Sequence, residues 1–152
     1  MRALPFVIFL ITNFGALAIG GFLMGEGPTS DWYQEANQAP WTPPGWVFGA
    51  AWTFSMIFYS VYMGIAWNRI NRTTLLGVYG VQLIFNIGWN PVFFNLHEAE
   101  MGLLIISFLT LLIWIKIFLF RKQMKGWSLL LLPYSIWLVI ATSLNLYFLM
   151  YN

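Results

Sequence analysis

The chain has 152 residues, of which 60% are hydrophobic and only 8% are charged. Soluble domains carry about 25% charged residues because their surfaces face water, so this composition excludes an ordinary soluble domain and predicts a surface that faces lipid. The absence of cysteine excludes a disulfide framework and a thiolate metal site, and a net charge of +2 without an aromatic-rich basic cluster argues against nucleic-acid binding.

The first apolar segment, residues 3–24, is predicted to be a retained transmembrane helix. A signal peptide is the alternative, but the segment is longer than a signal-peptide core, lacks a clean small-x-small cleavage site and is followed by further apolar segments. Small residues cluster in this segment and predict close packing against a neighbouring helix: Gly15, Ala16, Ala18, Gly20 and Gly21.

Residues 25–43 form the only long connection, named here the outer loop. Loops of this length in compact proteins are commonly lids or binding elements. We expect this loop to fold over the helices as a lid through Trp32, Tyr33, Pro43 and Pro44, with the prolines fixing the direction of Trp41. For Trp32, a place in the aromatic belt at the membrane surface is the alternative.

Four more apolar segments follow, at residues 44–67, 74–94, 101–120 and 127–150. Each has about the ~20 residues that cross a ~30 Å hydrocarbon core as a helix. None alternates in polarity as the strands of a membrane barrel do. The sequence therefore predicts an all-α integral membrane protein, with residues 1–152 forming a single domain of five transmembrane helices.

The charged residues divide by sign along the chain. The basic residues lie at the N-terminus and around the 2–3 and 4–5 turns: Arg2, Arg69, Arg72, Lys116, Arg121, Lys122 and Lys125. The acidic residues lie in the outer loop and after the third span: Glu26, Asp31, Glu35, Glu98 and Glu100. Five spans place each sign on one side, and the positive-inside rule puts the N-terminus inside and the C-terminus outside. Lys116, within the fourth span, is expected to snorkel toward the basic side.

No Asp, Glu, Arg or His lies in the middle third of any span. This disfavours an ion-coupled transporter and most acid–base catalysis, which need buried titratable groups. His97 lies beside Glu98 and Glu100 in a turn, where solvation is favoured over metal binding, so no metal site is predicted.

Polar and aromatic residues instead recur at helical spacing in three spans. The stripes are Trp52, Ser55 or Met56, Tyr59 and Ala66; Gln82, Asn86, Trp89 or Asn90, and Phe93; and Tyr134, Trp137, Ala141 and Asn145. Because amides in hydrocarbon are costly unless paired, these stripes are predicted to face inward. The amides either hydrogen-bond the helices together or, with the aromatic residues, line a ligand pocket.

Three blocks of residues occur in order along nearly the whole chain. They are Trp32-Tyr33 with Pro40-Trp41-Thr42-Pro43-Pro44 and Trp52; Gln82, Asn86, Trp89 and Phe93-Phe94; and Leu132-Pro133-Tyr134, Trp137, Ala141-Thr142 and Leu144-Asn145. Together the blocks closely resemble the translocator protein family, also called tryptophan-rich sensory proteins or peripheral benzodiazepine receptors.

The resemblance implies a five-helix bundle, usually a homodimer, with a pocket beneath the outer loop. Such proteins bind porphyrins and other haem-pathway tetrapyrroles, in some cases sterols, and isoquinoline or benzodiazepine drugs, with no required cofactor. The ligand-binding residues would be Trp41, Trp52, Gln82, Asn86, Trp89, Phe93, Tyr134, Trp137, Ala141 and Asn145. Some bacterial members are said to degrade protoporphyrin in light, which would assign that chemistry to Trp52 and Trp137.

The sequence departs from the family pattern at two places. Ala39 stands where the family commonly has a lysine that could pair with a porphyrin propionate. The C-terminal segment after Leu144 contains no basic residue, which weakens the case for a dedicated sterol site. The short chain favours a bacterial inner-membrane protein. The expected function is a tetrapyrrole receptor or sensor, with porphyrin breakdown and a carrier role as the alternatives.

Overall fold

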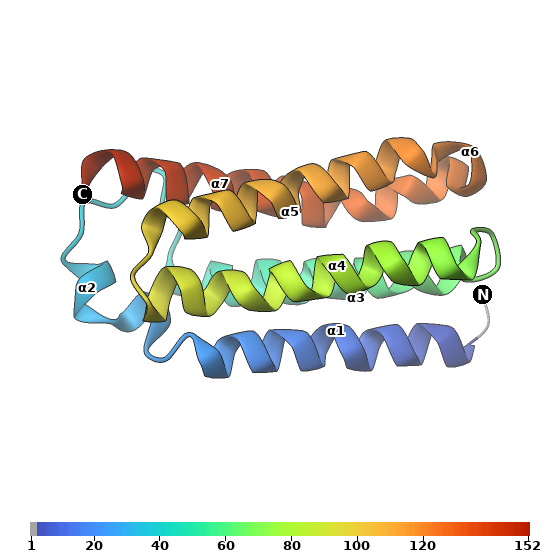
Figure 1. Ribbon diagram of the computed structural model, residues 1–152, viewed down its shortest axis with the longest axis horizontal. Coiled ribbons are helices and arrows are strands. Elements are labelled where there is room, and N and C mark those ends of the chain that lie inside the picture. Colours follow the sequence, from blue (N-terminus) through green and yellow to red (C-terminus); the bar gives the residue numbers. More distant parts are fainter. Residues whose placement is uncertain (1–2) are drawn as a thin grey trace.

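A computed structural model describes residues 3–152, and over this range the protein is all-helical without a strand (Figure 1). Five long helices run along the long axis of the molecule: α1 (Ala3–Leu23), α3 (Gly45–Ala66), α4 (Arg72–Asn90), α5 (Ala99–Leu119) and α7 (Leu132–Tyr151). The predicted all-α membrane bundle is confirmed. By length and composition alone, α4 does not qualify as a span although the other four do, because α4 carries the amide stripe.

The helix ends differ from the predicted spans where prolines and caps intervene. Helix α4 begins at Arg72, two residues before the predicted span, because Asn71 Oδ1 accepts a 3.2 Å hydrogen bond from the backbone N–H of Thr74. It ends at Asn90, and a π-helical turn, η2 (Pro91–Asn95), continues the chain. Before α7, residues 125–131 form a 3-10 helix, η3 (Lys125–Leu131), and Pro133 lies in the first turn of α7.

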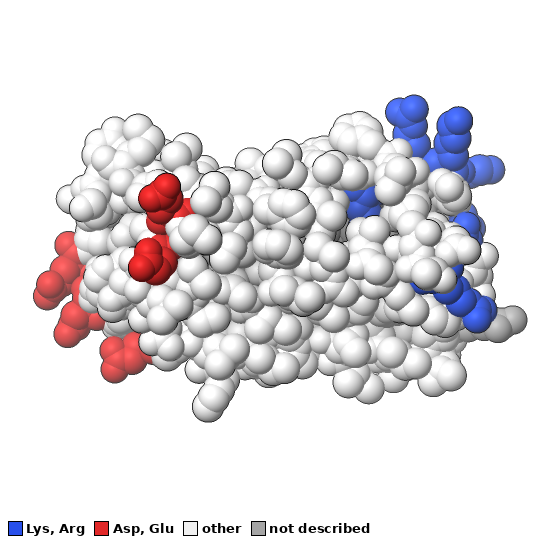
Figure 2. Space-filling view, in the orientation of Figure 1, with Lys and Arg blue, Asp and Glu red and all other residues white. Residues whose placement is uncertain are grey.

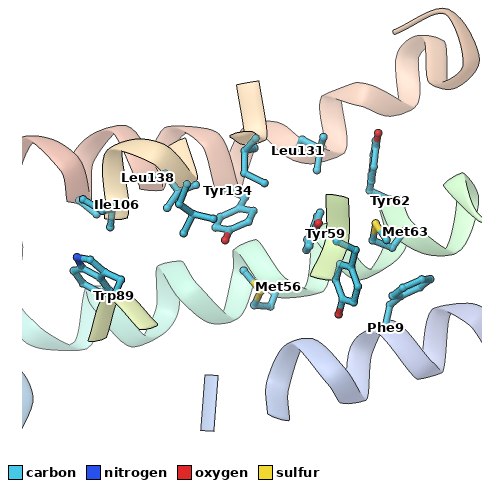
Figure 3. Close-up of a cluster of buried hydrophobic side chains, with 14 of the residues drawn as sticks. Phe9, Met56, Tyr59, Tyr62, Met63, Trp89, Ile106, Leu131, Tyr134 and Leu138 are labelled. Atoms are coloured by element: carbon cyan, nitrogen blue, oxygen red, sulfur yellow. The ribbon is translucent and has the colours of Figure 1, made fainter. Parts of the chain in front are cut away.

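The bundle packs in two joined groups of helices. Helix α1 contacts α3 and α4, while α7 contacts α5 and α3, and α4 also contacts α5. A tyrosine- and methionine-rich core fills the space between them. Figure 3 shows Tyr59 and Met63 of α3 between Phe9 of α1 and the α7 side of the bundle. Tyr59 and Met63 are fully buried, so α3 is the central element of the fold.

The charged side chains gather at opposite ends of the bundle, as the sequence predicts. Figure 2 shows the acidic side chains at one end and the basic ones toward the other. The basic end carries α6 (Arg121–Met124), and the acidic end carries the outer loop, with η1 (Gly27–Thr29) and α2 (Asp31–Gln34). The positive-inside rule therefore assigns the basic end to the cytoplasm.

Lys116 departs from its predicted position. The sequence predicts a side chain that snorkels to the basic surface, but the structure buries it with 1% exposure. Its Nζ donates to Tyr59 Oη at 2.6 Å and lies 4.6 Å from the centre of the Tyr59 ring. The reason is helix phase, because Lys116 continues the bundle-facing stripe of Ile106, Leu109 and Ile113. The interior of the bundle therefore contains the amine of Lys116 and is not lined by uncharged residues alone.

Candidate functional site

The outer loop folds across the acidic end of the bundle and is held there by aromatic contacts. The Trp32 ring stacks on His97, with centroids 4.3 Å apart, and also contacts Phe148. Tyr33 stacks parallel to Phe148 at 5.8 Å and meets Phe94 edge-on at 5.4 Å. Tyr33 is buried, and its burial raises the pKa of the phenol above the ordinary value. The loop thus has the geometry of a closed lid.

Hydrogen bonds fasten the rest of the loop to the outside of α7. The backbone N–H of Asn37 donates to Asn152 Oδ1 at 2.8 Å, and Asn152 Nδ2 donates back to the Asn37 carbonyl at 3.2 Å. Trp41 is 53% exposed, and its Nε1 donates to Ser143 Oγ at 3.1 Å. Pro43 follows, and Pro44 directly precedes α3. Trp41 therefore braces the lid from outside and lies apart from the cavities beneath it.

Beneath the lid lies a small enclosed cleft of about 10 Å³. Five of the predicted ligand-binding residues line it: Trp89, Phe93, Trp137, Ala141 and Asn145. The remaining lining residues are Tyr33, Phe48, Phe94 and Leu144. Since a water molecule needs roughly 10–15 Å³ by this kind of measure, the cleft in this closed arrangement has space for about one water.

Trp89 and Asn145 pair with one another at the wall of the cleft, whereas the indole of Trp137 stays unpaired within the described part of the chain. Trp89 Nε1 donates to Asn145 Oδ1 at 3.1 Å, and Asn145 Nδ2 donates to the Ala141 carbonyl at 3.0 Å. Trp137 is 5% exposed, and its Nε1 has no hydrogen-bond partner among residues 3–152. A buried donor without an acceptor is costly, so this indole N–H is available to an acceptor atom on a bound ligand.

A larger side cavity of about 250 Å³ lies between α1, α3 and α4. Its walls are Leu17, Gly21, Met24, Pro28, Phe48, Gly49, Trp52, Thr53, Trp89, Asn90 and Phe94. Phe48 borders both spaces and meets Trp137 edge-on at 5.4 Å. Trp89 and Phe94 line both spaces as well, so these three side chains together separate the side cavity from the enclosed cleft. Phe48 was not predicted from the sequence, because only the meeting of α3 with α4 and α7 makes it a partition.

Trp52 connects the side cavity to the other aromatic residues. Its ring lies 6.2 Å from Trp89, 6.0 Å from Tyr134 and 6.3 Å from Trp137, measured between centroids. Trp52 is partly exposed, whereas the other three are buried. The structure therefore brings together the two tryptophans, Trp52 and Trp137, to which the resemblance assigns photochemistry.

Besides Trp41, three predicted ligand-binding residues lie outside both cavities. Gln82 Nε2 donates to Tyr134 Oη at 3.0 Å, and Tyr134 Oη donates to Asn86 Oδ1 at 3.3 Å. All three are buried, and they line neither the cleft nor the side cavity. Of the two interpretations of the amides, hydrogen bonding between helices describes Gln82 and Asn86, while Asn145 belongs to the cleft wall.

A second polar network joins α1 to its neighbours and was not predicted. Asn13 Nδ2 donates to Ser60 Oγ at 2.9 Å, and Tyr79 Oη donates to Asn13 Oδ1 at 2.8 Å. Thr12 Oγ1 lies 2.6 Å from the same phenol oxygen. The available signal was Asn13 itself, an amide inside an apolar span that must find partners in a neighbouring helix.

Of the side chains that the structure describes, no ionisable one lines the enclosed cleft or the side cavity, apart from the phenol of Tyr33. Among residues 3–152, no three His, Asp or Glu side chains lie close enough together to hold a metal ion. His97 stacks on the lid instead, and Lys116 lies in the tyrosine core. The cavities offer aromatic faces, the unpaired N–H of Trp137 and apolar walls, which suits a flat apolar ligand with acceptor atoms.

The sequence of the chain is similar to one known family and to several named proteins. The sequence model described as the TspO/MBR family matches residues 6–151. The chain is 35% identical to a tryptophan-rich sensory protein of Cereibacter sphaeroides over 136 residues, covering 86% of this chain and 81% of the relative. It is 29% identical to the tryptophan-rich protein TspO of Chlorobaculum tepidum, covering 90% and 89%. It is 30% identical to the human translocator protein, covering 90% and 82%.

Proposed function

The chain belongs to the TspO/MBR family of membrane proteins, and on this premise we propose that it is a receptor that binds tetrapyrroles, such as protoporphyrin and haem-pathway intermediates, within the helix bundle. The observation that carries the proposal is the buried, unpaired Nε1 of Trp137 beside a wall of stacked aromatic residues. A tetrapyrrole is flat and largely apolar, and its ring nitrogens or carboxylates can accept from that donor.

The binding space forms when Phe48 moves. Sites for drug-sized ligands occupy about 300–1,000 Å³, whereas the side cavity has about 250 Å³ and the enclosed cleft about 10 Å³. Displacing the half-buried Phe48 ring adds its own volume and joins both spaces between Trp52, Trp89 and Trp137. The ligand would then contact indole faces on α3, α4 and α7.

Light-dependent chemistry is the second part of the proposal. A photoexcited porphyrin is a one-electron oxidant, and a ligand in the joined space would touch Trp52 and Trp137, the two indoles to which the resemblance assigns this chemistry, as well as Trp89. Ala39, at the position of the family's common lysine, is buried with 6% exposure. The porphyrin carboxylates therefore meet no cation at that position, and retention would rest on stacking and on the Trp137 donor.

A carrier role is the second candidate, supported by the position of the side cavity. Gly49 and Thr53 on its wall are exposed on the outside of the bundle, so in a membrane an apolar ligand could exchange with lipid there. Sterol-like ligands and isoquinoline drugs would use the same route. We further propose a homodimer in a bacterial inner membrane as the working assembly.

The test is a titration of purified protein in nanodiscs with protoporphyrin, first in darkness and then under illumination. Saturable quenching of tryptophan fluorescence in darkness supports the receptor proposal, and its absence rejects it. Loss of the porphyrin spectrum in light that disappears in Trp52→Phe and Trp137→Phe supports the photochemistry. If the porphyrin spectrum is lost in light as fast in both variants as in the wild type, these indoles are rejected as the reacting groups.

The carrier proposal needs a separate readout. Vesicles containing the protein should equilibrate a fluorescent porphyrin between donor and acceptor populations faster than protein-free vesicles. Gly49→Leu is a suitable variant because Gly49 lines the side cavity and a Cβ built there meets no atom within 4 Å, so a larger side chain can begin at this position and obstruct the opening. An unchanged transfer rate in Gly49→Leu would reject exchange through the side cavity.

A further inference from the structure

An apolar groove of about 280 Å³ lies at the basic end of the bundle, between α1 and α4. Its walls are Leu4, Pro5, Ile8, Phe9, Thr12, Trp67, Leu76 and Tyr79. None of these residues lines the enclosed cleft or the side cavity. The groove is therefore separate from the ligand site proposed above, and its first and last α1 residues are eight apart, which is about 12 Å along a helix.

The two ends of the groove differ in polarity. At the end deeper in the bundle, Thr12 Oγ1 and Tyr79 Oη lie 2.6 Å apart, and Tyr79 also donates to Asn13. At the basic end, the guanidinium carbon of Arg72 lies 4.7 Å from the centre of the Trp67 ring. The hydroxyls at the deep end thus satisfy one another, whereas the shallow end presents an exposed cation held over an indole.

The charge of Arg72 has no compensating acid nearby. All five acidic residues belong to the outer loop, to the turn before α5 or to the first turn of α5, at the opposite end of the molecule (Figure 2). Arg69, the neighbouring basic residue, is directed toward the α6 turn, where its Nη1 donates to the Gln123 carbonyl at 3.4 Å. Within the described residues 3–152, Arg72 is therefore the cation that a ligand head beside the groove would meet.

We propose that this groove binds one anionic phospholipid of the cytoplasmic leaflet, with an acyl chain along α1 and α4 and the phosphate on Arg72. An acyl chain fits because the groove walls are apolar and its deep end has no unsatisfied hydroxyl to address. A phosphate fits because a guanidinium offers paired N–H donors in a fixed plane. Trp67 is the C-cap residue of α3 at the basic end, and indoles are enriched where transmembrane helices meet lipid headgroups. Basic sites between transmembrane helices on the cytoplasmic side bind anionic lipid headgroups.

The experiment is native mass spectrometry of the purified, delipidated protein, titrated separately with a phosphatidylglycerol and a phosphatidylcholine of the same acyl chains. Arg72→Gln removes the cation, and Arg121→Gln is the matched control because Arg121 is exposed at the same end. Ile8→Trp fills the groove, and Ile19→Trp is its control, since Ile8 and Ile19 on α1 are 48% and 51% exposed. Inorganic phosphate is titrated as a headgroup without a chain.

The expected result is one retained phosphatidylglycerol, with retention reduced about fivefold in Arg72→Gln and also reduced in Ile8→Trp, but unchanged in both controls. Equal retention of the two lipids, or equal losses in Arg72→Gln and Arg121→Gln, would overturn the proposal. Displacement of the lipid by equimolar phosphate would indicate a free-anion site and overturn it as well. So would dissociation of a dimer by Ile8→Trp with lipid retention unchanged, because a second copy would then occupy the groove.

Discussion

The pair formed by Lys116 and Tyr59 gives a sharp test of how the bundle interior is held together. The Lys116 amine is buried, donates to Tyr59 Oη at 2.6 Å and to the Met63 sulfur at 3.4 Å, and lies over the Tyr59 ring. Tyr59→Phe removes the oxygen acceptor and leaves the buried amine with only the weak sulfur acceptor of Met63, at a cost of about 1–3 kcal/mol for a poorly satisfied donor. Lys116→Met removes the amine and preserves most of the side-chain volume.

The magnitudes predict an order of stability for the two variants. Lys116→Met loses the cation–π contact and leaves the buried Tyr59 hydroxyl without a partner among the described residues, which together cost about 1–3 kcal/mol. This cost is offset by the removed desolvation penalty of the amine, which for a buried ion is several kcal/mol. We therefore expect the free energy of unfolding of Lys116→Met to lie within about 1 kcal/mol of the wild-type value. Tyr59→Phe should be the least stable of the variants. The double variant should recover most of the loss in Tyr59→Phe.

The assay is thermal unfolding in a fixed detergent, followed by circular dichroism, with Tyr151→Phe as the control because Tyr151 is 55% exposed. The amine is a net stabilising group if Lys116→Met is less stable than Tyr59→Phe. It is also one if the stability loss of the double variant equals the sum of the losses of the two single variants. Either result would refute the reasoning.

Three further variants test the packing and the cavities. Gly102→Ala should lower stability by about 1–3 kcal/mol in the same assay, because the new Cβ would lie 2.8 Å from the Phe93 ring. Gly77→Ala is the control and should be tolerated, because a Cβ at Gly77 meets no atom within 4 Å. Equal stability losses in the two variants would contradict this prediction. Asn13→Leu should lower stability by about 1–2 kcal/mol because it breaks the hydrogen bonds to Ser60 and Tyr79. An equal loss in Asn68→Leu, at an exposed position, would show that the Asn13 network does not stabilise the bundle. Phe48→Ala should tighten porphyrin binding in darkness by joining the two cavities; weaker binding would mean that the ring is a contact and not a partition.

The sequence was sufficient for the features that repeat along the chain. Span length, the split of charge and the inward stripes are each carried by several residues, so the bundle and its two charged ends were predictable. The amides and aromatic residues of the stripes on α4 and α7 are buried as predicted: Gln82, Asn86, Tyr134, Trp137 and Asn145. A helix face on which amides recur is costly to expose to lipid, so it packs against other helices.

Features that depend on one residue's direction were not predictable in the same way. Trp41 contacts Ser143 on the outside of α7 because the path of the outer loop, not its composition, decides which side it reaches. Lys116 can snorkel or turn inward from the same position, and the phase set by Ile113 decided between them. Phe48 gains its role only where three helices meet. In each case the tertiary contact selects among directions that the sequence leaves open.

The most direct test of the central claim is dark binding of protoporphyrin to two variants of adjacent residues on α7. Ala141 is 3% exposed and lines the enclosed cleft, whereas Ile140 is 36% exposed and lines neither the cleft nor the side cavity. If the bundle binds the porphyrin between Trp52, Trp89 and Trp137, Ala141→Phe should abolish saturable quenching of tryptophan fluorescence while Ile140→Phe binds as the wild type does. Unchanged binding by a folded Ala141→Phe variant would place the ligand elsewhere and contradict the proposed site.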